Sequence, residues 1–269
     1  MTESRWVRIA LRAMTTLALA FIYLPIIVLA IYAFNDSRSQ VWPPGQVTGF
    51  SLRWFGEAIS NERVVDAFIT SIAAATGATL LALVLGTLAA LGVARHRFFG
   101  REAVSFMLVL PIALPGVLTG IALAATFKTL GVDFGLATII VGHATFCVVI
   151  AYNNVVARLR RLPRSTEEAS ADLGADTWQT FRRVLLPGIR TALLSGGLLA
   201  FALSFDEVIV TNFTAGPGTE TIPLWIFSAI QRPREVPVVN VVALALIVLS
   251  VVPVYIAERV SGAESAVVR

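Results

Sequence analysis

The chain has 269 residues, of which 57% are hydrophobic and only 14% are charged, whereas soluble domains carry about 25% charged residues. Uncharged apolar runs of about twenty residues exclude an ordinary soluble domain and predict an all-α, polytopic membrane protein. The net charge of +4 does not indicate a nucleic-acid partner, because the arginines lie in short loops beside apolar runs. Cys147 is the only cysteine, so an intrachain disulfide is excluded and no metal cluster is expected.

The apolar runs predict six membrane-spanning helices within a single domain, residues 1–269. In chain order the spans cover about residues 9–34, 67–93, 104–127, 136–156, 191–210 and 238–257. The first run is preceded by Arg5 and Arg8, but it is too long for the apolar part of a signal peptide. We therefore expect an uncleaved helix.

Three spans carry further patterns. The second has a small residue at every fourth position from Thr70 to Ala94, which is typical of packing against neighbouring helices. In the third, Pro111 and Pro115 remove two backbone hydrogen bonds and predict a bent or opened helix, which suits a transport pathway or a structural kink. His143 in the fourth span is a functional candidate, because ionisable groups are costly in lipid, although a packing role is equally compatible.

An even number of spans places both termini on the same side of the membrane. Of the 21 lysines and arginines, fifteen lie at the termini or in the loops on their side, and six lie on the other side. Because positive charge is enriched in cytoplasmic loops, both termini are predicted to be cytoplasmic. The polar loop at about residues 158–189 shares that side. The apolar stretch 222–227 is too short to span and is expected to be interfacial or re-entrant.

The polar loop has its own helix signals. A helix is expected to begin at Ser165 or Thr166, so that Glu167–Glu168 place negative charge near its N-terminus. Gly174 is expected to end or bend this helix. Pro187 is expected to begin the fifth span, where a missing N–H costs little.

This loop resembles the cytoplasmic loop of bacterial type I ABC-importer permeases, which reads Glu-Ala-Ala, three residues, Gly, nine residues, Ile-x-Leu-Pro. The matching positions here are Glu168-Ala169-Ser170, Gly174 and Val184-Leu185-Leu186-Pro187, with both spacings kept. The resemblance also covers chain length, span number and loop position. It implies that a cytoplasmic ABC ATPase dimer docks on this loop, whose site residues are Glu167, Glu168, Ala169, Gly174, Leu186 and Pro187. The plainer alternative is an ordinary surface helix between spans.

The sequence lacks a Gly-rich phosphate loop followed by Lys and Ser or Thr. We therefore expect ATP and Mg²⁺ to bind to the partner ATPase, and this chain to be neither an enzyme nor a carrier of a cofactor or metal. The resemblance further implies a second, homologous permease subunit, a periplasmic solute-binding protein and a multi-pass location in the bacterial inner membrane.

Two acidic residues, Asp206 and Glu207, fall late in the predicted fifth span, where they should face a cavity, a cation or a partner. The stretch from Ser204 to Gly216 resembles polyamine-importer permeases of the spermidine/putrescine type, which carry Ser-Phe-Asp-Asp/Glu and then Gly-Pro. It implies a cationic substrate, with Asp206 lining the pathway, Glu207 supporting it, and Ser204 and Phe205 beside them. Alternatively, the acids pair with an arginine or a helix end at the interface with the second permease. The sequence does not separate putrescine from spermidine.

Three other functions compete with this interpretation. The first is a permease of the same kind that carries another small organic solute or an ion, because such permeases share parts of the acidic stretch. A secondary transporter or channel is less compatible with the few buried charges and the lack of an obvious internal repeat. A membrane scaffold leaves the acids and the proline-containing span unexplained.

Overall fold

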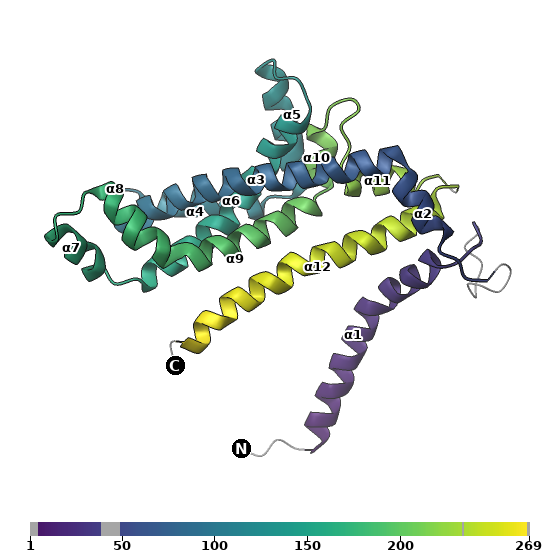
Figure 1. Cartoon of the computed structure of the whole chain (residues 1–269), viewed down its shortest axis with the longest axis horizontal. Helices are drawn as coiled ribbons and strands as arrows, with labels where there is room; N and C mark the ends of the chain where they lie inside the picture. Colours follow the sequence, from purple (N-terminus) through teal and green to yellow (C-terminus); the bar gives the residue numbers. More distant parts are fainter. Residues whose placement is uncertain (1–4, 39–48, 233, 268–269) are drawn as a thin grey trace. The chain divides into compact units, whose positions relative to one another are not determined.

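The computed structural model describes residues 5–38, 49–232 and 234–267, which fold almost entirely into helices (Figure 1). The elements are α1 (Arg5–Ala33), α2 (Arg53–Ser60), α3 (Glu62–Arg95), α4 (Arg101–Ala113), α5 (Gly116–Thr129), α6 (Leu136–Arg161), α7 (Ser165–Asp172), α8 (Thr177–Thr180), the π-helical turn η1 (Phe181–Leu185), α9 (Leu186–Phe205), α10 (Ile209–Thr214), α11 (Ile222–Ala229) and α12 (Val236–Val267). Within these described ranges, five helices are long and apolar enough to cross a membrane, and the bent pair α4–α5 makes a sixth if it counts as one span. The predicted all-α, multi-pass fold is therefore confirmed for the described part of the chain.

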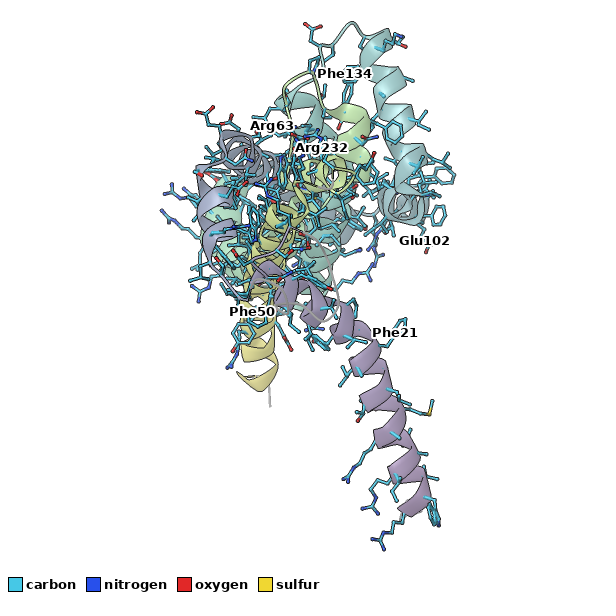
Figure 2. The ribbon with its side chains drawn as sticks, turned by 90° about the vertical axis from the view of Figure 1, so that its right-hand side faces the viewer. Phe21, Phe50, Arg63, Glu102, Phe134 and Arg232 are labelled. Carbon is cyan, nitrogen blue, oxygen red and sulfur yellow. The ribbon has the colours of Figure 1, made fainter. Side chains whose placement is uncertain are left out.

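The chain divides into two compact units, one of Met1–Val65 with Ile226–Ile247 and the other of Asp66–Trp225 with Val248–Arg269. In the first unit, the indole N–H of buried Trp54 donates a hydrogen bond to the carbonyl oxygen of Asn35 at 2.9 Å. The side chains of α1 are largely exposed, among them Phe21 (Figure 2). Such an apolar surface suits contact with lipid or another protein. The single domain expected over the whole chain stays a prediction.

In the second unit, the small residues of α3 form a packing surface. The positions concerned are all buried: Ala74, Ala78, Ala82, Gly86, Ala90 and Ala94. An added Cβ at Gly86 would lie 2.8 Å from the Cβ of Ala151 and 2.9 Å from the backbone nitrogen of Tyr152, both in α6. Because residues four apart form a ridge inclined to the helix axis, a neighbour that crosses at an angle can follow this row. The predicted packing role is confirmed.

The predicted third span is bent and opened, as expected, and the bend divides it into two helices. The helices α4 and α5 meet at an angle of 104°. The bend lies at Leu114–Pro115, where Leu114 is extended because a residue before proline is disfavoured in the helical region. Pro111 lies inside α4 without ending it. After the break, α5 packs against α10, and a Cβ at Gly120 would collide with the ring of Phe213.

The predicted boundaries of the fifth span are wrong at both ends. The helix α9 runs from Leu186 to Phe205 instead of about 191–210. In its last turn the amide of Asp206 bonds to Ala202 at 3.2 Å and that of Glu207 bonds to Ser204 at 3.4 Å, after which the chain leaves the helix and turns into α10. The two acids therefore lie in a break between two helices and not inside a span.

Two other boundaries shift. The helix α6 continues to Arg161, so the polar loop is shorter than the expected residues 158–189. The apolar stretch 222–227 is part of the short helix α11.

Candidate functional site

The polar hairpin, residues 165–185, comprises α7, a glycine turn, α8 and η1. The first helix begins at Ser165 and carries Glu167 and Glu168 in its first turn, as predicted. Gly174 then adopts a φ of +81°, and its N–H donates to the carbonyl oxygen of Ala171 at 2.8 Å, while the amide of Ala175 bonds to Ser170 at 3.1 Å. These two hydrogen bonds satisfy carbonyl groups at the C-terminus of α7. They require a left-handed backbone conformation at residue 174, which glycine adopts without steric cost. The helix-ending role predicted for Gly174 is confirmed.

The return arm of the hairpin begins with a capping box. The side chain of Asp176 accepts a hydrogen bond from the backbone N–H of Gln179 at 2.7 Å, and the Gln179 side chain bonds back to the Asp176 amide. The arm continues through η1 into α9, whose first turn contains Pro187 as expected. Sequence reasoning missed this cap, although an aspartate followed three residues later by a glutamine is its usual signature.

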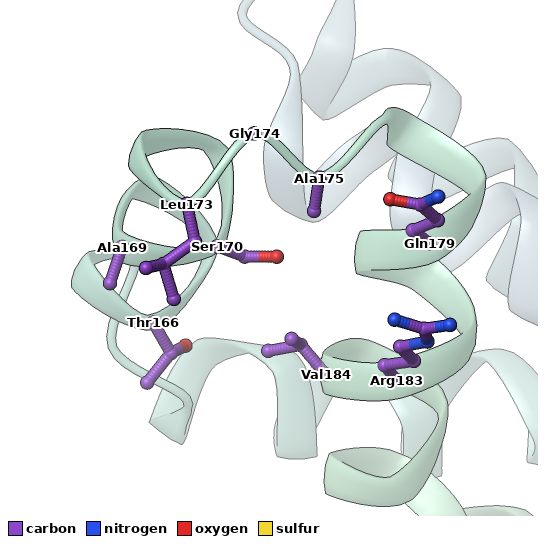
Figure 3. Close-up of a pocket in the computed structure, with 9 residues that line it drawn as sticks. All are labelled: Thr166, Ala169, Ser170, Leu173, Gly174, Ala175, Gln179, Arg183 and Val184. Carbon is purple, nitrogen blue, oxygen red and sulfur yellow. The ribbon is translucent and has the colours of Figure 1, made fainter.

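A hollow of roughly 540 Å³ separates α7 from the return arm. In Figure 3, Ser170 of α7 points across it toward the return arm, which carries Gln179 and Arg183 on the opposite side. The full lining consists of Thr166, Ala169, Ser170, Leu173, Gly174, Ala175, Gln179, Arg183 and Val184. Leu173 is 89% exposed and Trp178 is 64% exposed. Apolar side chains exposed on a polar loop are typical of a protein-binding surface. Neither residue stood out in the sequence, since a single leucine or tryptophan in a loop carries no pattern.

The hairpin is also attached to the end of α3. The Arg95 guanidinium lies 2.8 Å from a carboxylate oxygen of Glu167. The Arg164 guanidinium donates to the carbonyl oxygens of Ala94 and Arg95 at 3.3 and 3.2 Å, which satisfies carbonyls at the C-terminus of α3. Consequently the Glu167 side chain points inward to Arg95, whereas Glu168 and Ala169 are exposed. Movement of α7 is thereby linked to α3 as well as to α9.

This attachment gives a testable result. Glu167→Arg places two positive charges together, and we expect amide hydrogen exchange in α7 to become about fivefold faster, for a loss of ~1 kcal/mol. The double variant Arg95→Glu/Glu167→Arg restores the attraction and should recover most of the protection. Glu168→Arg is the matched control, because its side chain is exposed one position away. Equal exchange in Glu167→Arg and the control would contradict the role of the ion pair.

The second candidate site is the acidic break, residues 204–208, between α9 and α10. Asp206 is exposed, and its carboxylate accepts a hydrogen bond from the Ser250 hydroxyl at 2.7 Å. Glu207 is half-buried, and its carboxylate accepts the backbone N–H of Val210 at 2.9 Å, which caps the start of α10. Among the described residues, neither acid lies within salt-bridge distance of an arginine or lysine.

The other two predicted pathway residues are buried. Phe205 stacks on Phe201 with ring centroids 5.8 Å apart and meets Phe68 edge-on at 6.4 Å. Ser204 bonds to His143 at 2.7 Å. The structure therefore brings all four residues together at one break but leaves only Asp206 exposed. The alternative interpretation pairs the acids with an arginine or a helix end at the interface with a second permease. For Glu207, the structure supplies such a helix end within this chain, namely the start of α10.

Residues 82–262 match the family described as "Binding-protein-dependent transport system inner membrane component". The chain is 38% identical over 244 residues to the putrescine transport system permease protein PotI of Escherichia coli (strain K12), covering 88% of this chain and 84% of that protein. It is 34% identical over 243 residues to the spermidine/putrescine transport system permease protein PotC of Haemophilus influenzae, covering 90% and 92%. Its fold is similar to a chain in the crystal structure of a bacterial alginate ABC transporter in complex with an alginate pentasaccharide-bound periplasmic protein. That match has a TM-score of 0.71 at 19% identity and covers 95% and 94% of the two chains.

Proposed function

This chain belongs to the family of binding-protein-dependent transport system inner membrane components, and on that premise we propose that it forms half of the translocation pathway of an ATP-driven polyamine importer. In this role it is a permease subunit, not an enzyme. It works in the bacterial inner membrane beside a second, homologous permease and receives solute from a periplasmic binding protein.

The polar hairpin is the observation that carries this proposal. It is a rigid element: a glycine turn and a capping box fix its two arms, and Arg95 and Arg164 fasten it to α3. It presents Leu173 and Trp178 beside a hollow. A partner that binds there can move α3 and α9 together as a rigid body.

The partner proposed for the hairpin is a cytoplasmic ABC ATPase dimer, which binds ATP and Mg²⁺ and supplies the energy of hydrolysis. The distribution of positive charge supports a cytoplasmic position for the hairpin and for both termini. The chain's own contribution is mechanical: it couples the movement of the ATPase to helices that border the pathway.

The substrate proposed is a polyamine, either putrescine or spermidine. Asp206 supports a cationic solute, because it offers an exposed carboxylate that accepts a hydrogen bond from the neutral Ser250 hydroxyl. A negative charge near the pathway attracts a diamine or triamine more strongly than a neutral solute, above all where water is scarce. The names of the two curated relatives point to the same class of solute.

The proposal is tested by reconstituting this chain with its ATPase, its second permease and its binding protein in proteoliposomes. We expect uptake of labelled putrescine or spermidine only when ATP and Mg²⁺ reach the ATPase. A ligand screen on the binding protein decides between the two polyamines. Uptake without the ATPase would indicate a secondary transporter, and ATP-driven uptake of a different solute alone would overturn the substrate class.

A further inference from the structure

A buried histidine joins the two sides of the acidic break. His143 of α6 is completely buried. Its Nδ1 lies 2.7 Å from the hydroxyl of Ser204 in the last turn of α9, and its Nε2 lies 2.8 Å from the hydroxyl of Thr211 in α10. One side chain of a third helix therefore bonds to residues on both sides of Asp206 and Glu207.

The hydrogen bonds assign the protons of this network. The Thr211 hydroxyl donates its only hydrogen to the carbonyl oxygen of Glu207 at 3.0 Å, so it can only accept from His143. Nε2 is therefore a donor, and in the neutral imidazole, which carries a single N–H, Nδ1 accepts from Ser204. Every polar group has a partner in this arrangement, and a fully satisfied buried network favours one geometry over its alternatives.

Close packing of α10 on α6 brings the network together. Gly142 precedes His143, and a Cβ there would lie 3.1 Å from Val210 and 3.4 Å from Thr214. One turn earlier, the Thr138 hydroxyl bonds to the carbonyl oxygen of Thr214 at 2.7 Å. The short helix α10 is therefore held on α6 near both of its ends, by Thr211 and by Thr214, and the backbone of Glu207 is hydrogen-bonded to the same network.

We propose that His143 is a positioning residue that clamps α9 and α10 to α6 and so fixes the place where Asp206 meets the transported solute. It touches no solute itself and acts through Ser204, Thr211 and the backbone of Glu207. The clamp follows from this geometry alone, whereas its effect on uptake rests on the proposed function. The two parts are therefore tested separately.

The clamp is tested by cysteine labelling in the assembled importer. Cys147→Ala removes the single native cysteine of this chain, and Val208→Cys places a thiol in the break. We expect His143→Phe, which fills the space but lacks both hydrogen bonds, to raise the labelling rate at position 208 at least threefold. Thr211→Val removes one of the two bonds with little change in volume and should give a smaller increase. It also provides the test if His143→Phe does not assemble.

Two controls separate this effect from general loosening. Tyr152→Phe deletes a different hydrogen bond of α6, the 2.7 Å contact with the Ser105 hydroxyl, and should leave labelling at position 208 unchanged. A cysteine at Thr177 in the polar hairpin should react at the same rate with or without His143→Phe. An unchanged rate at position 208 in both His143→Phe and Thr211→Val would overturn the clamp, whatever the importer carries.

The functional effect is read from uptake. We expect His143→Phe to lower the maximal uptake rate at least tenfold, with assembly and basal ATP hydrolysis within twofold of the wild type. His143→Gln, which can still donate to Thr211, should recover part of the rate. Faster labelling with unchanged uptake would overturn the positioning role. Failure of the wild-type importer to carry polyamines would instead count against the proposed substrate and would leave the labelling result intact.

Discussion

We expect the replacement of Gly174 by aspartate to lower ATP-driven uptake at least tenfold and to reduce the amount of ATPase that copurifies with the permease. The residue has a φ of +81°, and an added Cβ would meet nothing within 4 Å. Strain is limited to about 1–2 kcal/mol, and aspartate is among the residues that best tolerate this conformation. The hairpin therefore still forms, but it carries a new charge beside exposed Leu173, on the surface proposed to bind the ATPase.

Gly100→Asp is the matched control for this variant. Gly100 has a φ of +82°, and an added Cβ there also meets nothing within 4 Å. It precedes α4 in a loop predicted to face the same side of the membrane, so the substitution introduces the same strain and charge away from the hairpin. We expect it to keep at least half of the uptake. If both variants retained uptake, or lost it equally, the hairpin would not be the docking element.

We expect the replacement of Asp206 by asparagine to lower uptake of a polyamine at least tenfold while the importer still assembles. Asparagine keeps the size of the side chain and an oxygen that can accept from Ser250, so the charge is the main loss. Two charges 4 Å apart near a protein surface attract by ~4 kcal/mol. Because Asp206 is exposed and solvent screens the interaction, we expect about a third to a half of that value, which corresponds to roughly tenfold or more. The measurement is the initial rate of labelled putrescine or spermidine uptake in proteoliposomes.

Glu207→Gln tests whether position matters as well as charge. The glutamine oxygen can still accept the N–H of Val210 and cap α10, so folding should be little affected. Because the carboxylate of Glu207 already bonds to that helix end, we expect uptake to stay within about threefold of the wild type. Equal losses of uptake in Asp206→Asn and Glu207→Gln would contradict the separate roles of Asp206 in the pathway and Glu207 as a helix cap. Unchanged uptake in both variants would indicate that both acids have only a structural role.

The start of the polar hairpin, its glycine turn and its proline were predictable because their signals are local. The start at Ser165, the turn at Gly174 and the placement of Pro187 each depend on residues only a few positions away. The attachment of Arg95 and Arg164 was not predictable, because the contacting residues are about 70 positions apart in the chain and no short motif records them.

The acidic break shows why hydropathy misplaces a helix end. Apolar residues follow Glu207 directly, so a pattern averaged over twenty positions continues through the break to about residue 210. The helix ends earlier because the backbone turns at Asp206 and Glu207 caps a new helix. His143 was recognised as unusual from its place in a span, but its two partners lie 61 and 68 positions away. A choice between a functional and a packing role therefore needed the fold.

The π-helical turn η1 has a consequence for recognition. It lies within an otherwise continuous helix from Thr177 to Phe205 and accommodates one more residue per turn than an α-helix. Each residue of an α-helix advances by about 100° and 1.5 Å. A relative with the same motif and spacing but without the wide turn would present Leu173 and Trp178 in a different direction around the axis of α9. On the proposal that an ATPase docks on the hairpin, the match between the two proteins depends on this rotation as well as on the spacing of the motif.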